Sequence, residues 1–304
     1  MRRKIIFTLL CVFVVEYRTC EVKIMSENKN ASNCNHVCEG CKVSDCASRS
    51  AQSFRIEPSP RSRIGKIIGV VSGKGGVGKS FVTSMLAAEM ARRGYHAAVL
   101  DGDITGPSQA RSFGIHEKAM GDGELIHPAR TKNNIQVLST NMLLDAEDQP
   151  VIWRGPVVAG LLKQFYQEAF WDDVDYMFVD LPPGTGDVPL TLFQSIPLDG
   201  IIIVTSPQEL VSMVVAKAIN MARMMDIKIL GLIENMAYVV CPCCGERFKV
   251  FGESHINEIA DKHGLPVLAS IPLDPRIAQC SDNGTIEDLK IEALDPAADF
   301  IEKM

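Results

Sequence analysis

Residues 67–80 read IIGVVSGKGGVGKS, an apolar run that passes into a loop rich in glycine. The run Ile67–Ser72 predicts a buried strand, and Lys79–Arg93 predicts a helix that ends at Gly94. The loop between them satisfies the pattern G-x-x-x-x-G-K-[ST] in the strand–loop–helix context that this motif requires. Glycines are needed because backbone N–H groups wrap the phosphates, and side chains would block that approach. The sequence therefore predicts a P-loop that binds a nucleotide with Mg²⁺.

Each part of this loop has a defined chemical task in the prediction. Lys79 reaches the β- and γ-phosphates, and the Ser80 hydroxyl is a ligand of Mg²⁺. The helix that follows adds the positive end of its dipole. We expect the nucleotide to be bound by Gly73, Lys74, Gly75, Gly76, Val77, Gly78, Lys79 and Ser80.

Outward from the loop, short apolar runs alternate with longer helical patterns. Further strands are predicted at Ala97–Asp101, Ile135–Ser139, Tyr176–Leu181, Ile201–Thr205, Ile229–Glu234 and Val267–Ile271. Further helices are predicted at Val157–Phe170, Gln208–Met225 and His255–His263. Strands that are apolar throughout and separated by helices predict an α/β fold, with a mostly parallel sheet covered by helices on both faces. Ligands of such sheets bind beyond the carboxyl ends of the strands.

The N-terminal part has a different composition from this domain. Basic residues precede an apolar run from Ile5 to Val15, which resembles the start of a signal peptide but lacks a cleavage site and is too short to span a bilayer. We interpret residues 1–24 as an extension upstream of a true start at Met25, with a real anchor as the alternative. Residues 25–63 are predicted to be a flexible cysteine-rich tail, and residues 64–304 the ATPase domain. No membrane partner is expected.

Charge and cysteine content limit the classes of function. The net charge of −6 and the pI of about 5.6 argue against a protein that binds nucleic acid through a cationic face. The chain has ten cysteines, and most of them lie in two tight groups. Tight groups suit a metal or a cluster in a reducing compartment, whereas a disulfide framework would spread cysteines over many loops. We therefore expect a cytoplasmic protein.

Acidic residues end two of the predicted strands. Asp101-Gly102-Asp103 follows the second strand, and we expect Asp103 to orient the attacking water while Asp101 supports the metal shell or the loop. Asp180 is the last residue of a predicted strand and the first residue of DLPPGTGD, and it is the expected water-mediated ligand of Mg²⁺. Asp187 is a candidate for coupling the loop to a dimer partner. A plain turn that contains two aspartates remains the alternative for the first segment.

Four strings together resemble one family. GKGGVGKS resembles the deviant P-loop of the MinD/ParA/nitrogenase-iron-protein class, and with DGDITGPS, DLPPGTGD and CPCCG it resembles the Mrp/Nbp35 family of iron–sulfur cluster carrier ATPases. The resemblance covers Arg63 to the C-terminus. It implies that Lys74 contacts the partner's nucleotide in an ATP-promoted homodimer, and that Asn235 hydrogen-bonds adenine. ATP is expected rather than GTP, because no N-K-x-D run follows. Lys74, Lys79 and Asp103 are the expected catalytic residues.

The resemblance also selects two cysteines. The family pattern is C-P-x-C, and alignment on Gly245 selects Cys241 and Cys244, spaced C-x-x-C. Two thiolates are half of a [4Fe–4S] ligand set, and a symmetric homodimer supplies the other half. Cys243 is a spare thiol, a third ligand or a bystander. A structural zinc knuckle or a redox dithiol is the alternative for this site.

Two further groups of sulfur-containing residues occur in the chain. The first group is predicted to bind a second [4Fe–4S] cluster or zinc and consists of Cys34, Cys38, Cys41 and Cys46. The alternative for this group is an unstructured tail. The other, interpreted as core packing, is the set of methionines on one predicted helix, Met213, Met221, Met224 and Met225. Cys280 is expected to have no role.

The sequence as a whole predicts an ATPase that carries a dimer-bridging [4Fe–4S] cluster and transfers it to apoproteins, with slow hydrolysis of ATP coupled to transfer. One alternative is a positioning ATPase of the MinD/ParA kind. Another is a reductase component that passes electrons through a bridging cluster.

Overall fold

The computed structural model describes residues 55–103, 106, 108–143, 155–208 and 211–304. The chain divides into two units, Met1–Gln52 and Ser53–Met304, and only the second contains described residues. The predictions for the N-terminal extension, for most of the cysteine-rich tail and for Cys34, Cys38, Cys41 and Cys46 lie outside the described residues.

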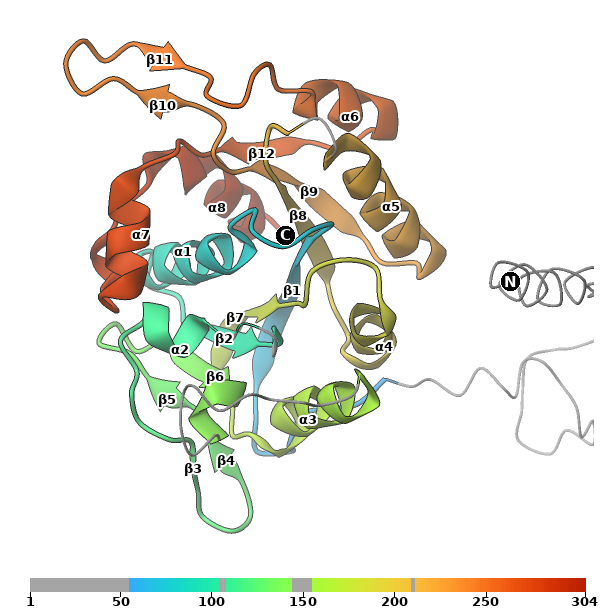
Figure 1. Cartoon of the computed structure of the whole chain (residues 1–304). Helices are drawn as coiled ribbons and strands as arrows, with labels where there is room; N and C mark the ends of the chain where they lie inside the picture. The colour runs from blue at the N-terminus through green and yellow to red at the C-terminus, as the bar shows by residue number, and fades with distance from the viewer. Residues whose placement is uncertain (1–54, 104–105, 107, 144–154, 209–210) are drawn as a thin grey trace, which may run out of the picture. The chain divides into compact units, whose positions relative to one another are not determined.

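A mostly parallel sheet forms the centre of the second unit (Figure 1). Its strand order is β12-β9-β8-β1-β7-β2-β6-β5. All of these strands pair in parallel except β5, which is antiparallel to β6. The bounds are β1 Ile64–Ser72, β2 Ala97–Asp101, β5 Ala129–Arg130, β6 Gln136–Ser139, β7 Val174–Asp180, β8 Gly200–Thr205, β9 Ile229–Glu234 and β12 Val267–Ser270.

The central strands are apolar throughout because helices cover both faces of the sheet. Successive side chains of β1 point to opposite faces, so that Ile67 and Val71 belong to one buried cluster and Ile68 and Val70 to the other. This arrangement confirms the predicted α/β class with helices on both faces.

The first cluster lies against the helices on the right of Figure 1, which are α3 Gly155–Glu168, α4 Asp187–Ser195, α5 Val211–Met224 and α6 Ile256–His263. The second lies against those on the left, which are α1 Lys79–Arg92, α7 Pro275–Asp282 and α8 Asp295–Glu302. The short helix α2 Gln109–Ser112 follows β2, and three 3₁₀ turns cover Thr140–Leu143, Ile286–Asp288 and Glu292–Leu294.

Several short elements were not predicted. Besides β5, they include two antiparallel hairpins, β3 Met120–Gly121 with β4 Ile126–His127, and β10 Val239–Val240 with β11 Arg247–Phe248. Strands of two residues carry no detectable periodicity, so no sequence pattern predicts them. The second hairpin projects from one end of the sheet at the top of Figure 1.

The interpretation of the helix methionines as core packing was only partly right. Met221 is buried and Met225 packs against the core, but Met213 and Met224 are 60% and 87% exposed. Among the helices of the described residues, none has the length and apolar content that a membrane crossing requires.

Candidate functional site

The P-loop lies between the carboxyl end of β1 and the start of α1, and two of its glycines, Gly73 and Gly78, have close neighbours that leave no room for a side chain. Gly78 has a φ of 83°, and a Cβ atom there would lie 2.1 Å from the Asn235 Nδ2 atom. A Cβ atom on Gly73 would lie 2.2 Å from Val214 Cγ1. Both positions exclude any larger residue without movement of the packed side chain, and Gly78 in addition requires a left-handed backbone. The loop is thereby held against β9 and α5.

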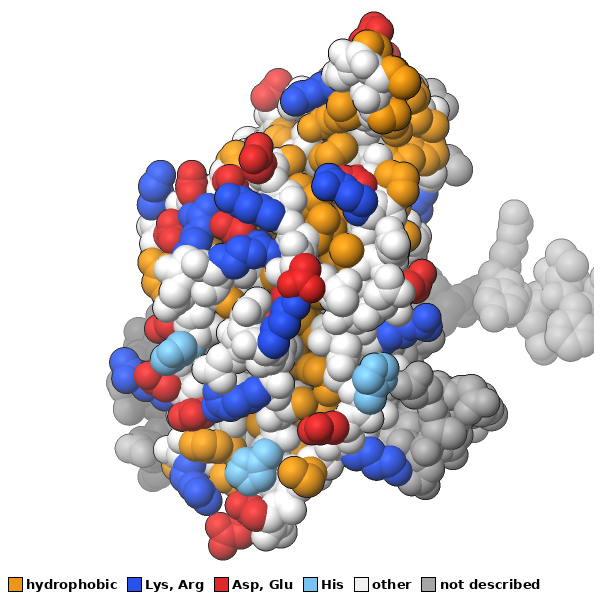
Figure 2. All heavy atoms as spheres, turned by 90° about the vertical axis from the view of Figure 1, so that its left-hand side faces the viewer, with side chains coloured by type: hydrophobic (Ala, Val, Ile, Leu, Met, Phe, Trp, Pro, Cys, Tyr) orange, Lys and Arg blue, Asp and Glu red, His pale blue; other side chains and the backbone are white. Residues whose placement is uncertain are grey.

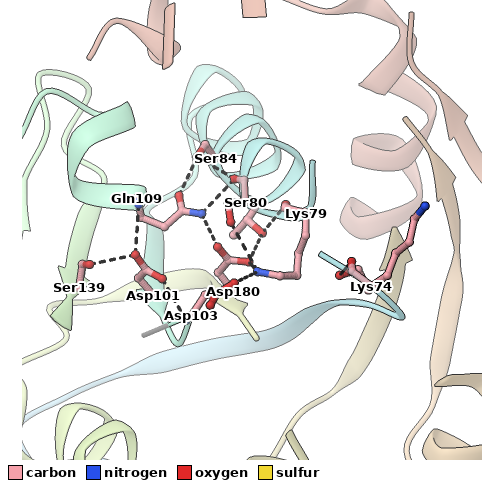
Figure 3. Close-up of polar contacts among 11 residues, drawn as sticks. Lys74, Lys79, Ser80, Ser84, Asp101, Asp103, Gln109, Ser139 and Asp180 are labelled. Carbon is pink, nitrogen blue, oxygen red and sulfur yellow. Dashed lines mark hydrogen bonds and ion pairs between the residues drawn. The ribbon is translucent and has the colours of Figure 1, made fainter. Parts of the chain in front are cut away.

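The side chain of Lys79 points into a group of carboxylates (Figure 3). Its Nζ atom lies 2.5 Å from Asp180 Oδ1, 3.3 Å from Asp103 Oδ2 and 3.5 Å from Ser80 Oγ. Burial by itself would lower the pKa of Lys79, but attraction to Asp180 and Asp103 outweighs it and raises the pKa above its usual value. Lys79 therefore stays charged although it is only 5% exposed.

Asp101 is completely buried behind this group. Burial, reinforced by repulsion from Asp180, raises the pKa of Asp101 to about 7. Its carboxylate accepts hydrogen bonds from Ser139 Oγ at 2.9 Å, from the Gln109 backbone N–H at 3.1 Å and from the Asp103 backbone N–H at 3.2 Å. These contacts give Asp101 the role of supporting the loop that carries Asp103.

The donor chemistry of the site fits Mg²⁺. Asp180 and the Ser80 hydroxyl offer hard oxygen ligands, and both flank Lys79. Within the described part of the chain, no group of three or more His, Cys, Asp and Glu side chains is placed to hold a metal by itself. Mg²⁺ commonly uses one or two protein oxygens and completes its shell with phosphates and water, so this donor set is sufficient.

Lys74, the second lysine of the loop, points away from the carboxylates (Figure 3). Its Nζ atom donates a hydrogen bond to Gln208 Oε1, beyond the end of β8. The loop around it is fixed by a hydrogen bond of 2.9 Å from Ser72 Oγ to the Lys74 carbonyl. Lys74 is therefore not part of the carboxylate group around Lys79 in its own chain.

Asn235 lies directly after β9 and contacts the P-loop. Its Nδ2 atom donates to the Val77 carbonyl at 3.0 Å. Its Oδ1 atom is buried and has no hydrogen-bond partner among the described residues. The next residue, Met236, has a φ of 59°, which is unusual for a residue other than glycine. The backbone thus adopts a left-handed conformation directly after Asn235, the residue that contacts the P-loop.

The C-x-x-C segment forms the tip of the β10–β11 hairpin. The tip is closed by hydrogen bonds of 2.9 Å from Cys241 N to Glu246 O and from Gly245 N to Cys241 O. The backbone N–H groups of Cys244 and Cys243 donate to the Cys241 sulfur and lower the pKa of its thiol below its usual value. Cys241, Cys243 and Cys244 are free thiols, and Cys243 and Cys244 are exposed.

Apolar side chains surround these thiols. Figure 2 shows hydrophobic side chains gathered at the top of the molecule, the end at which Figure 1 places the hairpin. Phe248 on β11 is 50% exposed and Val250 just beyond it is 53% exposed. Val240 and Phe251 are exposed as well.

Sequence reasoning missed the polar residues behind the phosphate-binding loop. Gln109, Ser84 and Ser139 are buried and hydrogen-bonded to the aspartates or to one another. The only available signal was the position of Gln109 immediately after the DGDITGPS string.

The site combines a strand, a glycine-rich phosphate-binding loop and a helix with a buried lysine beside aspartates that end two strands. This combination defines a P-loop NTPase. The chain belongs to the ParA family described as NUBPL iron-transfer P-loop NTPase, whose profile matches residues 63–304. The predicted resemblance is thereby confirmed.

Individual relatives agree with this assignment. The iron–sulfur cluster carrier protein of Clostridium perfringens is 40% identical over 270 residues, which cover 84% of this chain and 95% of the relative. Among solved structures, a nucleotide-binding protein of Archaeoglobus fulgidus in complex with ADP is 40% identical, with a TM-score of 0.67 over 75% of this chain and 89% of that one. The Pyrococcus furiosus cell division ATPase MinD is 23% identical, with a TM-score of 0.58 over 79% of this chain and 99% of that one, and shows the same fold.

Proposed function

We propose that this ATPase carries iron–sulfur clusters as cargo. Two copies share one [4Fe–4S] cluster between the Cys241 and Cys244 thiolates of each, and they deliver it to apoproteins. The observation that carries the proposal is the pair of free thiols at C-x-x-C spacing on a projecting hairpin, six residues after an asparagine that contacts the P-loop.

The cysteine geometry supports a shared cargo. The described residues contain no group of three or more His, Cys, Asp and Glu side chains placed to hold a metal, so the pair Cys241 and Cys244 of one copy offers half of the usual four thiolates. Backbone N–H groups aimed at the Cys241 sulfur favour the thiolate, which is the form that binds iron. Exposure of the hairpin leaves the cargo open to a receiving protein, and the apolar side chains beside it suit a second copy of the chain.

The nucleotide site supports the ATPase half of the proposal. Lys79 neutralises the phosphates, Ser80 and Asp180 hold Mg²⁺, and Mg²⁺ when bound would neutralise charge on the phosphates. Asp103 lies within ion-pair distance of Lys79, where a carboxylate orients the attacking water. The unpartnered Oδ1 atom of Asn235 is the acceptor that would receive the amino group of adenine. Lys74 reaches the nucleotide of the partner copy.

Anaerobic reconstitution with iron and sulfide tests the carrier function. We expect wild-type protein to bind about four irons and four sulfides per dimer, and to activate an apo-ferredoxin-type client. Cys241→Ser and Cys244→Ser should each abolish cluster binding at the hairpin and transfer. The matched control is Cys280→Ser, at a partly buried thiol on α7, which should retain both. Full iron content and transfer in the Cys241→Ser/Cys244→Ser double variant would refute the proposal.

The same preparation separates the rival functions. A cluster that is reduced and reoxidised repeatedly without leaving the protein would favour the electron-donating reductase, whereas transfer to the client supports the carrier. ATP-dependent sedimentation with liposomes or DNA, without iron binding, would favour a positioning ATPase. Cys243→Ser decides whether the third thiol contributes.

We also propose a cytoplasmic location, in line with free thiols on an exposed hairpin. Whether Cys34, Cys38, Cys41 and Cys46 bind a second cluster or zinc remains a prediction from the sequence. Iron and zinc analysis of protein lacking residues 1–46 tests it, because a second site would disappear while the hairpin site remains.

A further inference from the structure

Gln109 is a buried polar residue that joins three segments of the nucleotide site. It is the first residue of α2 and is fully buried. Its backbone N–H donates to Asp101 Oδ2 at 3.1 Å, at the end of β2. Its Nε2 atom donates to Asp180 Oδ2 at 2.8 Å, at the end of β7, and to the Ser80 carbonyl at 2.9 Å, at the start of α1. Figure 3 shows the side chain reaching from α2 to the last two contacts.

Every polar atom of this side chain is used. The amide nitrogen carries two N–H donors, and each has one acceptor. The amide oxygen accepts from Ser84 Oγ at 2.7 Å, one turn further along α1 than Ser80. The Asp180 carboxylate and the Ser80 carbonyl can only accept hydrogen bonds, so the end of the amide that faces them is the nitrogen. A glutamate could not donate these bonds, and it would add a fourth carboxylate near Lys79.

Gln109 also distinguishes the two oxygens of Asp180. Oδ2 accepts from Gln109, whereas Oδ1 faces Lys79 and Thr83. The Gln109 Nε2 atom therefore fixes the rotation of the Asp180 carboxylate. It also fixes the distance between this carboxylate and the main chain of Ser80. Asp180 and Ser80 are the two residues to which the proposed function gives Mg²⁺.

We infer that Gln109 is a positioning residue for the magnesium site: it holds Asp180 and Ser80 at the separation that Mg²⁺ bound to a nucleotide requires. This inference rests on the proposed function of Asp180 and Ser80. Residues that orient metal ligands from behind commonly change metal affinity by about 10- to 100-fold when replaced. Because Gln109 contacts Asp180 and Ser80 and would act through them, its loss should act on the metal dependence of binding.

The test measures binding of a fluorescent ATP analogue while Mg²⁺ is titrated, and again in EDTA. In Gln109→Leu we expect the Mg²⁺ midpoint to rise about tenfold or more, with affinity in EDTA within about twofold of wild type. Ser84→Ala, a milder change that removes the hydrogen bond to the amide oxygen, should raise the midpoint by a smaller factor. It keeps the inference testable if Gln109→Leu fails to fold, as judged by circular dichroism.

Gln136 provides the matched control. It is another buried glutamine, and its side chain pairs with the Asp172 backbone through Nε2–O and Oε1–N hydrogen bonds of 2.8 and 2.9 Å, away from the P-loop. Gln136→Leu should lower thermal stability and leave the Mg²⁺ midpoint within about twofold of wild type.

Asp180→Asn distinguishes failure of the role inferred for Gln109 from failure of the magnesium site itself. If it raises the midpoint and the folded Gln109 and Ser84 variants do not, the inference about Gln109 is overturned and the metal site stands. If Asp180→Asn leaves the midpoint unchanged, the assignment of Asp180 falls, and the inference falls with it.

Discussion

Asn235 Nδ2 donates to the Val77 carbonyl at 3.0 Å and so ties the end of β9 to the middle of the P-loop. The chain then runs from Asn235 to the first cysteine of the hairpin in six residues. Hydrogen bonds from Ala237 N to Ile271 O at 2.9 Å and from Leu273 N to Tyr238 O at 2.7 Å hold this connection against the segment after β12. We expect a movement of the P-loop to reach the hairpin by this route.

Asn235→Ala should uncouple the two sites. It leaves the Val77 carbonyl without its side-chain donor, so the free energy of unfolding should fall by about 1–3 kcal/mol. ATP should then no longer change the rate of cluster transfer to an apoprotein, although the hairpin still binds the cluster. Urea denaturation and transfer assays with and without ATP measure both effects. Asn257→Ala, at an exposed position on α6, is the control and should be within about 0.5 kcal/mol of wild type. A wild-type response to ATP in Asn235→Ala would contradict this route.

Alanine should lower the stability of the fold at one P-loop glycine and leave it unchanged at another. Gly78→Ala places a methyl group 2.1 Å from Asn235 Nδ2 at a φ of 83°, so we expect a loss of at least about 1–3 kcal/mol of stability. Gly75 has no atom within 4 Å of the added Cβ, so Gly75→Ala should keep the stability of wild type. If the loop wraps phosphates, Gly75→Ala should still weaken ATP binding. Thermal melting measures the loss of stability, and nucleotide titration measures the loss of ATP affinity. Equal stability of the two variants would contradict this prediction.

Long, continuous patterns made most of this fold predictable. The strands from Ile67 and Ala97 and the helix after Lys79 were found because buried parallel strands are apolar throughout and the P-loop fixes the boundary between strand and helix. The predicted strand at Ile135–Ser139 begins one residue later in the structure, at Gln136. Such shifts of one residue reflect hydrogen bonding at the strand end, which residue type does not record.

The site was less predictable where its geometry depends on contacts between distant segments. The position of Asp180 followed from its place at the end of an apolar strand, but its partner Gln109 lies 71 residues earlier in the chain. No local pattern records such a pairing. The contact of Lys74 with Gln208 was likewise unpredictable, because it joins two loops that only the parallel order of β1 and β8 brings together. The hairpin at Cys241 was missed because its strands have two residues each.

The buried carboxyl of Asp101 should make stability depend on pH. Its pKa is raised from 3.8 to about 7 in the folded state, so the folded protein binds this proton more tightly than the unfolded chain. The resulting stabilisation is fully present below about pH 4 and is lost as the pH rises through about 7. The free energy of unfolding of wild type, measured in urea without Mg²⁺ or nucleotide, should therefore fall relative to that of Asp101→Asn as the pH rises over this range. A constant difference between the two proteins would show that Asp101 does not titrate there.

Lys74 should matter for self-association and not for binding within one chain. Its Nζ atom hydrogen-bonds Gln208 and points away from the carboxylates around Lys79, so Lys74→Ala leaves the contacts of Lys79 with Asp180 and Asp103 intact. Nucleotide affinity measured at low protein concentration should stay within about threefold of wild type, a change below about 0.7 kcal/mol. Sedimentation velocity with a non-hydrolysable ATP analogue should show a dimer for wild type and a monomer for Lys74→Ala. Gln208→Ala is the control, because it removes the hydrogen bond but keeps the lysine, and it should still dimerise. A Lys74→Ala protein that dimerises normally, or one that as a monomer no longer binds nucleotide, would show that this lysine does not act across the interface between two copies.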